Sequence, residues 1–354
     1  MKRVFLTLSV AVLAGCAHTG GTGPPGRRTA ADDPRFRYEG RVDFADRAAP
    51  VLIWQGTRVS LDFEGAELAL LFGRTTGQVF FDAIVDGGPL RLKAPAGESS
   101  RVVYPGRLSG GRHTLALFKR SEASAGDSAF LGVETAGETF APAPPAYKTS
   151  MLFFGDSITA GACNEDGAAD QWDDRGTHNN AKSYAALTAA AFNADYRNIA
   201  VSCMGISAGY VAVKAGEVWD RLYPKADSPR ADLSWKPAYI FVNYGENDFS
   251  FTKGQGEPFP PDFTDRYIAL VEDIRAAWPD ARIILLRGGM AGGAKGEALI
   301  NAWTAAADKL QAEDPKLGRF VFAHWTEDHP RVSDDEALAA ELAAWLKAQP
   351  FAPN

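Results

Sequence analysis

The sequence predicts two domains, an all-β sandwich of jelly-roll type followed by an α/β domain with a mostly parallel sheet. The first observation is the length of 354 residues, which exceeds that of one typical domain. The second is a change of pattern: residues 36–140 contain short strand-like runs, whereas residues 149–354 alternate strands with helices. The third is the proline-rich segment 141–148 between them, which predicts a linker.

The first domain is predicted from strand-like runs and the turns between them. The turns contain sequences such as Asp86-Gly87-Gly88 and Ser109-Gly110-Gly111, and no helical period of comparable length is present. Many short strands at this spacing favour a β-sandwich of jelly-roll type. The clearest runs are residues 59–63, 68–72, 79–85 and 113–118.

The second domain is predicted from alternating apolar strands and amphipathic helices. Such alternation implies a mostly parallel sheet with helices on both faces. The expected strands are residues 151–154, 195–201, 239–243, 282–286 and 320–323, and the expected helices are residues 183–192, 263–278, 296–308 and 334–347.

The first fifteen residues have the pattern of an export signal. Lys2 and Arg3 precede an apolar run that is too short for an ordinary transmembrane helix. The segment Leu13-Ala14-Gly15-Cys16 resembles the lipobox of bacterial lipoproteins, which implies that Cys16 is lipidated and anchors the protein to a membrane. The alternative is an ordinary secretory signal. Both interpretations predict export to the periplasm or cell surface, with residues 16–35 as a flexible tether.

Composition argues against a nucleic-acid partner and leaves the state of two cysteines open. The formal net charge is −7 and no basic cluster is present, which argues against nucleic-acid binding. No residues have metal-ligand spacing, and no cofactor is expected. Besides Cys16, the chain contains Cys163 and Cys203, which in an exported protein could form a disulfide or remain free thiols.

A serine at the end of the first predicted parallel strand is the candidate nucleophile. The apolar run 151–154 ends in Gly155-Asp156-Ser157, and a sharp turn at the glycine leaves the hydroxyl at the strand's carboxyl end. Serine needs a base to become nucleophilic. His324 and His329 both follow the last predicted strand, so either can reach the same edge of a parallel sheet.

Two further strand-end loops can stabilise an oxyanion. Asn247 follows the predicted strand 239–243 and supplies a side-chain amide donor. The loop Ser202-Cys203-Met204-Gly205 follows another strand and can supply a backbone N–H group. Together with the serine and a late histidine, these loops predict a site for acyl transfer.

These segments carry a family resemblance. Gly155-Asp156-Ser157, Gly245-Glu246-Asn247-Asp248 and His329-Pro330 resemble the motifs of the SGNH, or GDSL, hydrolases. Within that superfamily the chain is similar to carbohydrate esterase family 2, whose members place a jelly-roll domain before the hydrolase domain. The similarity includes Gly40-Arg41-Val42 and Gly111-Arg112-His113-Thr114 and covers nearly all of the chain after the tether. It implies that residues 149–354 form an SGNH hydrolase domain.

The resemblance implies specific roles. Ser157 matches the nucleophile, His329 the general base and Asn247 the side-chain donor of the oxyanion hole, to which the Ser157 N–H also contributes. The family's Ser-Gly-x-Gly segment is Ser202-Cys203-Met204-Gly205 here. Its first glycine is therefore replaced, and Cys203 and Gly205 are alternatives for the remaining N–H donor.

The family pattern has two positions for the acid that orients the histidine. Many SGNH enzymes have aspartate three residues before the histidine, where this chain has Thr326. Some members of the esterase family have it two residues before, where this chain has Glu327, while Asp328 would point elsewhere. We interpret Glu327 as the orienting residue. The alternative is a Ser–His dyad whose imidazole is held by a backbone carbonyl.

The function implied by the resemblance is removal of acetyl groups from polysaccharides such as acetylated xylan or glucomannan, through an acyl-enzyme. Trp172 and Trp325 lie near the site segments and are candidates to stack on a sugar ring, or else core residues. One alternative is an esterase for another small acyl ester or for a cell-wall glycan. A second is a carbohydrate-binding lipoprotein whose catalytic site has decayed. A third assigns glycan binding to the β domain.

Overall fold

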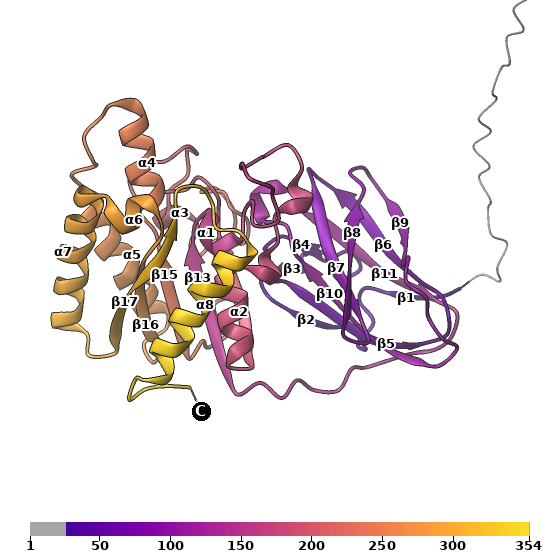
Figure 1. Cartoon of the computed structure of the whole chain (residues 1–354). Helices are drawn as coiled ribbons and strands as arrows, with labels where there is room; N and C mark the ends of the chain where they lie inside the picture. Colours follow the sequence, from indigo (N-terminus) through magenta and orange to yellow (C-terminus); the bar gives the residue numbers. More distant parts are fainter. Residues whose placement is uncertain (1–25, 354) are drawn as a thin grey trace, which may run out of the picture.

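The computed structural model describes residues 26–353 and has the two predicted domains (Figure 1). The first contains two antiparallel sheets with strand orders β4-β11-β6-β9 and β5-β10-β7-β8, which is the topology of an eight-stranded jelly roll. The sandwich prediction is therefore confirmed. The strands are β4 (Val51–Leu52), β5 (Arg58–Glu64), β6 (Leu68–Thr75), β7 (Val79–Val85), β8 (Gly88–Ala94), β9 (Ser100–Val103), β10 (Arg112–Lys119) and β11 (Ser128–Thr135).

Four short strands extend these sheets. They are β1 (Arg27–Ala30), β2 (Arg37–Glu39), β3 (Val42–Asp43) and β12 (Thr139–Phe140). β1 pairs with β11, so the segment predicted as a tether already belongs to the sandwich from Arg27 onward. The polar composition of this segment does not indicate a strand. β1 is held by backbone pairing and by a 2.8 Å hydrogen bond between Thr29 Oγ1 and Thr139 Oγ1 rather than by apolar side chains. Cys16 and the export signal lie outside the described residues.

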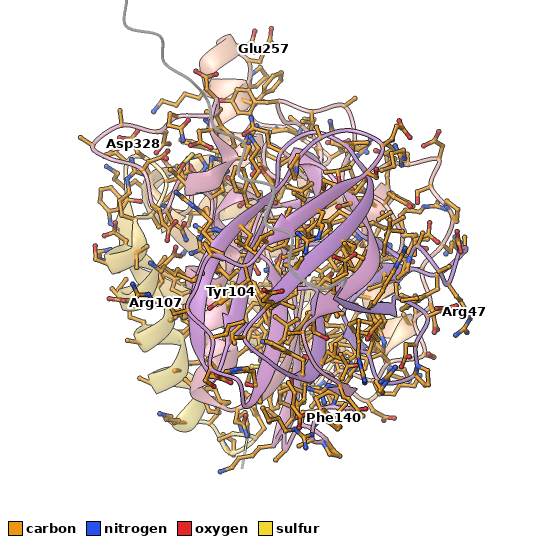
Figure 2. The ribbon with its side chains drawn as sticks, turned by 90° about the vertical axis from the view of Figure 1, so that its right-hand side faces the viewer. Arg47, Tyr104, Arg107, Phe140, Glu257 and Asp328 are labelled. Carbon is orange, nitrogen blue, oxygen red and sulfur yellow. The ribbon has the colours of Figure 1, made fainter. Side chains whose placement is uncertain are left out.

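The core of the sandwich forms between the inward faces of its two sheets. Side chains that point inward alternate along each strand, as a β-strand requires. Phe72 of one sheet and Phe81 of the other are both fully buried and stack with their ring centroids 5.2 Å apart. Figure 2 views the molecule from the side of this domain and shows the side chains of both sheets.

The second domain is built on a five-stranded parallel sheet with the order β14-β13-β15-β16-β17. Residues 141–148, which precede it, contain no helix or strand. All of its paired strands are parallel, so their carboxyl ends share one edge, which confirms the predicted fold class. The strands are β13 (Thr149–Gly155), β14 (Ala194–Ala200), β15 (Tyr239–Asn243), β16 (Arg282–Met290) and β17 (Leu317–Thr326).

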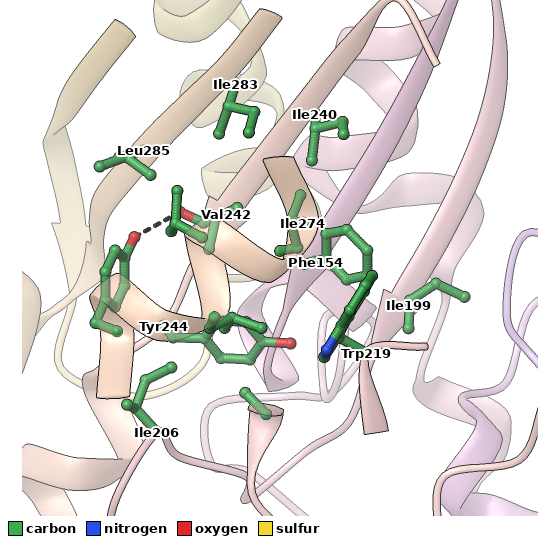
Figure 3. Packing of buried hydrophobic residues seen from close by; sticks show 14 of the residues in the cluster. Phe154, Ile199, Ile206, Trp219, Ile240, Val242, Tyr244, Ile274, Ile283 and Leu285 are labelled. Carbon is green, nitrogen blue, oxygen red and sulfur yellow. Dashed lines mark hydrogen bonds between the residues drawn. The ribbon is translucent and has the colours of Figure 1, made fainter. Parts of the chain in front are cut away.

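Helices cover both faces of this sheet, and three short helices follow its strands. Alternate strand residues face opposite layers: Phe153 packs with α2 and α8, whereas Phe154 packs with α3, α5 and α7. Figure 3 shows Phe154 among other members of its cluster, including Ile274 and Trp219. None of the helices in residues 26–353 is both long and apolar enough to cross a bilayer. The helices are α1 (Ser157–Ala160), α2 (Tyr184–Ala191), α3 (Ala215–Val218), α4 (Glu246–Gln255), α5 (Phe263–Ala277), α6 (Ala291–Lys295), α7 (Glu297–Glu313) and α8 (Val332–Lys347).

The two domains share buried surface. Ile53 and Trp54 of the sandwich are buried in the same apolar cluster as the sheet residues that face α5 and α7. Gln55 adds polar contacts, because its Nε2 donates to Asn198 Oδ1 at 2.7 Å and to the Ala200 carbonyl at 2.8 Å. The first domain is thus packed firmly against strand β14 of the second.

Candidate active site

The candidate nucleophile sits in a tight turn between β13 and α1. A Cβ on Gly155 would lie 2.1 Å from Thr159 Oγ1, so this position has no room for a side chain. Asp156 is the N-cap of α1, and its carboxylate accepts a hydrogen bond from the Ile158 N–H at 3.1 Å. Ser157 is therefore the first residue of α1, where its own N–H has no partner within the helix.

His329 is the histidine that reaches this serine. It lies in the loop between β17 and α8, and its Nε2 is 2.8 Å from Ser157 Oγ. The other candidate, His324, lies within β17, and its Nε2 is 2.9 Å from Asp334 Oδ1. The order of the strands allows either histidine to be the base, and the structure identifies His329 as the one in contact with Ser157.

Asp170, and not the predicted Glu327, is the acid that orients the imidazole of His329. Its Oδ2 is 2.6 Å from His329 Nδ1, and its Oδ1 accepts a hydrogen bond from Arg331 at 2.8 Å. Glu327 instead pairs with Lys295 at 2.6 Å, with 69% of its side chain exposed. Its interpretation as the orienting residue is therefore wrong. The dyad alternative also fails, because the imidazole faces a carboxylate rather than a backbone carbonyl.

The path of the chain explains why Glu327 does not reach the imidazole. β17 continues to Thr326, whose Oγ1 donates to the Asp328 carbonyl at 2.6 Å, so the chain turns at this point. Asp328, next to the histidine, lies in the upper part of the view in Figure 2, and Glu327 projects toward α6 and the solvent. Neither acid of the histidine's own segment contacts the imidazole.

Asp170 carries a negative charge at neutral pH. Burial acts to raise its pKa, but hydrogen bonds from His329 and Arg331 outweigh burial and hold the pKa of Asp170 well below its usual range. An ionised Asp170 holds the proton of the imidazole on Nδ1, so Nε2 can accept the proton of Ser157. This is the arrangement that general-base activation of a serine requires.

Asn247 supplies an amide beside the serine. It lies in the first turn of α4, and its Nδ2 is within hydrogen-bond distance of Asp156 Oδ2 at 3.1 Å and of the Met204 carbonyl at 3.3 Å. Burial, partly offset by the Ile158 N–H, raises the pKa of Asp156 to about 8. Gly245, the N-cap of α4, has a φ of +121°, which glycine adopts readily.

The loop after β14 places Cys203, rather than Gly205, toward the serine. Cys203 lines the same cavity as Ser157 and Asn247, and its φ of +69° lies in the left-handed region. Gly205 packs inward, since a Cβ there would lie 1.7 Å from the Ala208 carbonyl oxygen. Asp248 fixes the loop by accepting the N–H groups of residues 206–208 at 2.6–2.9 Å. Of the two alternatives, Cys203 is the one that lines the cavity containing Ser157.

The catalytic residues open into a cavity of about 630 Å³. Trp172 lines it and lies edge-on to His329, with the ring centroids 5.4 Å apart. Trp325 does not line the cavity, and its ring is covered by Lys295 at 4.0 Å. The remaining lining residues include several that sequence reasoning missed: Tyr210, Glu246, Phe249, Ser250, Lys253, Gly254 and residues 290–292.

The first domain holds two of the loops that form this site. Glu122 is 1% exposed, and its carboxylate accepts hydrogen bonds from the Ser202 N–H at 3.0 Å and from Arg175 at 3.0 Å. Arg120 is also buried and donates to Asp82 of its own domain, to Glu165 and to the Gly176 carbonyl. The loops before Cys203 and around Trp172 are therefore both anchored on the segment that follows β10.

Cysteine and histidine side chains lie together beside the catalytic pair. Two groups have ligand atoms within 4.8 Å of one another, namely Cys163, Asp166 and His178, and Cys163, Asp170 and His329. In the second group the carboxylate is already hydrogen-bonded to the imidazole. Cys163 and Cys203 are free thiols, and burial raises the pKa of Cys163 so that its thiol stays protonated.

Both domains match known protein families. The N-terminal domain of carbohydrate esterase 2 matches residues 38–144, and the GDSL-like lipase/acylhydrolase family matches residues 153–347. The second match spans more than half of the chain.

Individual relatives agree with these matches. The chain is 32% identical over 330 residues to the cellulase/esterase CelE of Acetivibrio thermocellus, covering 89% of this chain but only 40% of CelE. It is 28% identical to an acetylxylan esterase / glucomannan deacetylase of Cellvibrio japonicus, covering 83% of this chain and 84% of that protein. A solved family two carbohydrate esterase from Clostridium thermocellum, in complex with cellohexaose, superposes with a TM-score of 0.77 at 32% identity and covers 88% of this chain and 98% of that one.

Proposed function

The chain belongs to carbohydrate esterase family 2, and on this basis we propose that it is a serine esterase that removes O-acetyl groups from polysaccharides such as acetylated xylan or glucomannan. The observation that carries the proposal is the continuous contact from Asp170 through His329 to Ser157, at 2.6 and 2.8 Å. The names of the relatives from Cellvibrio japonicus support the substrate class.

In the first half of the reaction, an acetyl group is transferred to the enzyme. His329 Nε2 accepts the proton of Ser157 as Oγ bonds to the acetyl carbonyl carbon. The developing oxyanion accepts hydrogen bonds from Asn247 Nδ2 and from the N–H groups of Ser157 and Cys203. His329 then gives the proton to the sugar oxygen, the bond from that oxygen to the acetyl carbon breaks, and acetyl-Ser157 remains.

In the second half, water replaces the sugar. His329 accepts a proton from water as the water oxygen bonds to the acetyl carbon, and the same donors stabilise the second oxyanion. The proton returns to Ser157 Oγ as its bond to the acetyl group breaks, which releases acetate. Asp170 stays ionised throughout and stabilises the imidazolium.

Aromatic side chains at the cavity are suited to a sugar. Tyr210 lines the cavity with 55% of its surface exposed, and Trp172 borders the imidazole. An aromatic ring offers apolar area to the face of a sugar ring. We assign Tyr210 and Trp172 to sugar binding, and not Trp325, because Trp325 does not line the cavity and its ring is covered by Lys295.

The proposed site of action is outside the cytoplasm, at a membrane. The support is the sequence alone: a basic start, an apolar run and Leu13-Ala14-Gly15-Cys16, with Cys16 as the lipidated residue. Metabolic labelling with a radioactive fatty acid tests this, because a Cys16→Ser variant should lose the label and leave the membrane fraction. Equal labelling of both proteins would remove the anchor from the proposal.

The activity is tested by acetate release from acetylated xylan and glucomannan, with Ser157→Ala as the comparison. Release by the wild type that disappears in the variant is the expected result. Hydrolysis of 4-nitrophenyl acetate without release from either polysaccharide would keep the esterase and reject the polysaccharides. A folded wild type without either activity would favour the carbohydrate-binding protein with a decayed site.

A further inference from the structure

A second cavity of about 400 Å³ lies between the two domains. The first domain lines it with residues 40–42 and Phe44, and the second lines it from β13, β14 and the segment 232–235 before β15. It shares no lining residue with the active-site cavity. Ile199, one of its lining residues, is labelled in Figure 3 beside Trp219 and Phe154. A ligand here would therefore leave the catalytic residues free.

Arg197 brings to this cavity a guanidinium group whose Nε has no acceptor among residues 26–353. It lies on the edge strand β14, and its guanidinium stacks 3.9 Å above the ring of Trp235. Its Nε atom is fully buried and has no hydrogen-bond partner in the part of the chain that the structure describes. Three carboxylates attract the guanidinium group without a hydrogen bond, and each accepts from another donor: Asp195 from Trp235 at 2.8 Å, Asp232 from Ser234 at 2.8 and 2.9 Å, and Glu39 from Tyr147 at 2.8 Å.

Arg41 brings a second guanidinium to the same cavity. Its Nη1 donates to the Trp219 and Arg221 carbonyls at 3.0 and 2.6 Å, and the guanidinium packs over Trp54. These neutral acceptors fix its position without neutralising its charge. Desolvation lowers the pKa of both Arg41 and Arg197, despite the opposing attraction of acidic residues nearby.

The lining is suited to a ligand that has both an anionic and an apolar part. A partly buried guanidinium whose Nε lacks an acceptor is costly, and a carboxylate matches its paired N–H donors. Trp235, Trp278 and Phe44 add aromatic surface, and Phe44 remains 43% exposed. The volume is within the usual range for small-molecule sites, roughly 300–1,000 Å³.

We propose that this cavity is a second saccharide site that binds a uronic acid unit, with its carboxylate on Arg197 and Arg41 and its ring against the aromatic side chains. Such a site would hold an acidic branch or segment of the polysaccharide while the active site acts elsewhere on the chain. The choice of a saccharide rests on the proposed function, whereas the preference for a carboxylate rests on the two guanidinium groups.

Isothermal titration calorimetry with glucuronate tests the proposal. The protein is the full chain carrying Ser157→Ala, which removes turnover and leaves the second cavity intact. We expect glucuronate to bind at least tenfold more tightly than glucose or free acetate. Arg197→Gln should weaken glucuronate binding at least tenfold, and Arg319→Gln, which changes an exposed arginine paired with Asp308, should not.

A second variant tests the cavity without changing either arginine, in case Arg197→Gln does not fold. Ser234 is exposed at the cavity, so Ser234→Trp should obstruct it while leaving both arginines in place, and should also weaken glucuronate binding at least tenfold. Undiminished binding in folded Arg197→Gln or Ser234→Trp would overturn the proposal, as would equal binding of glucose or of free acetate. No acetate release by the wild type would instead overturn the proposed function, whatever the calorimetry gave.

Discussion

Asp170 Oδ2 lies 2.6 Å from His329 Nδ1, although 159 residues separate the two along the chain. The acid therefore comes from the loop that follows the nucleophile rather than from the segment of the histidine. Arg331, two residues after the histidine, binds the other carboxylate oxygen at 2.8 Å and also donates to the Gly167 carbonyl. The histidine segment thus carries the side chain that holds Asp170 in place.

Substitution of Asp170 by asparagine should nearly abolish the esterase activity. The amide keeps the size of the carboxylate but can neither stabilise the imidazolium nor fix the Nδ1–H tautomer. We expect kcat on 4-nitrophenyl acetate to fall roughly 10³- to 10⁴-fold, as in other serine hydrolases that lose this acid. The matched control is Glu327→Gln, which should change kcat no more than a few-fold because Glu327 contacts Lys295 instead. A large loss in Glu327→Gln with Asp170→Asn unaffected would reverse the assignment.

Asp170 should also make the stability of the folded protein depend on pH. The pKa of Asp170 is lower in the folded protein than its usual value near 3.8, so the unfolded chain binds the proton more tightly. Its contribution to stability is therefore present above about pH 4 and is lost as the pH falls below that value. The difference in melting temperature between wild type and Asp170→Asn should be largest at pH 6–7 and shrink toward pH 3. Scanning fluorimetry at both ends checks this, and a constant difference would contradict it.

The sequence predicts those parts of the site that adjoin regular strands. Ser157 and Asn247 each follow a run of buried apolar residues, and parallel strands bring their carboxyl ends to one edge. Asp170 lies between α1 and α2, in a stretch with two short 3-10 turns and no apolar period, so nothing local indicates where its side chain points. Its place depends on tertiary contacts: Asp170 itself bonds to His329 and Arg331, and the first domain holds the same loop at Arg175 and Gly176.

For a related reason, the sequence does not indicate strand β1. Arg27 and Arg28 are exposed and polar, as in a tether, and the strand exists because β11 offers an unpaired edge. The choice between Cys203 and Gly205 likewise depends on packing, because both residue types suit a loop. The close approach of the Ala208 carbonyl to Gly205 separates them, and that contact is formed by tertiary structure.

Glu122→Gln should test whether the first domain positions the active site. One carboxylate accepts both the Ser202 N–H and Arg175, and an amide retains only one of its two acceptor oxygens. Because Ser202 precedes Cys203, we expect kcat to fall about tenfold with KM nearly unchanged, a pattern that indicates loss of transition-state stabilisation. Glu138→Gln, an exposed acid of the same domain that pairs with Arg27, is the control and should retain full kcat. A proportional rise in KM with kcat intact would mean that the domain affects substrate binding only.

Substitutions at Cys203 should show that its backbone, not its thiol, serves the reaction. Cys203→Gly keeps the N–H group and removes the cost of a left-handed backbone, about 1–2 kcal/mol for a residue with a side chain. Glycine also loses more backbone entropy on folding, which offsets about 0.5–1 kcal/mol of this gain, so the melting temperature should rise slightly. Because the N–H group is kept, kcat should stay within a few-fold of the wild type. Cys203→Val places a β-branched residue at the same φ and should lower kcat about 10²-fold by displacing an oxyanion donor. If the valine variant hydrolysed 4-nitrophenyl acetate as fast as the glycine variant, the Cys203 N–H would have no part in the oxyanion hole.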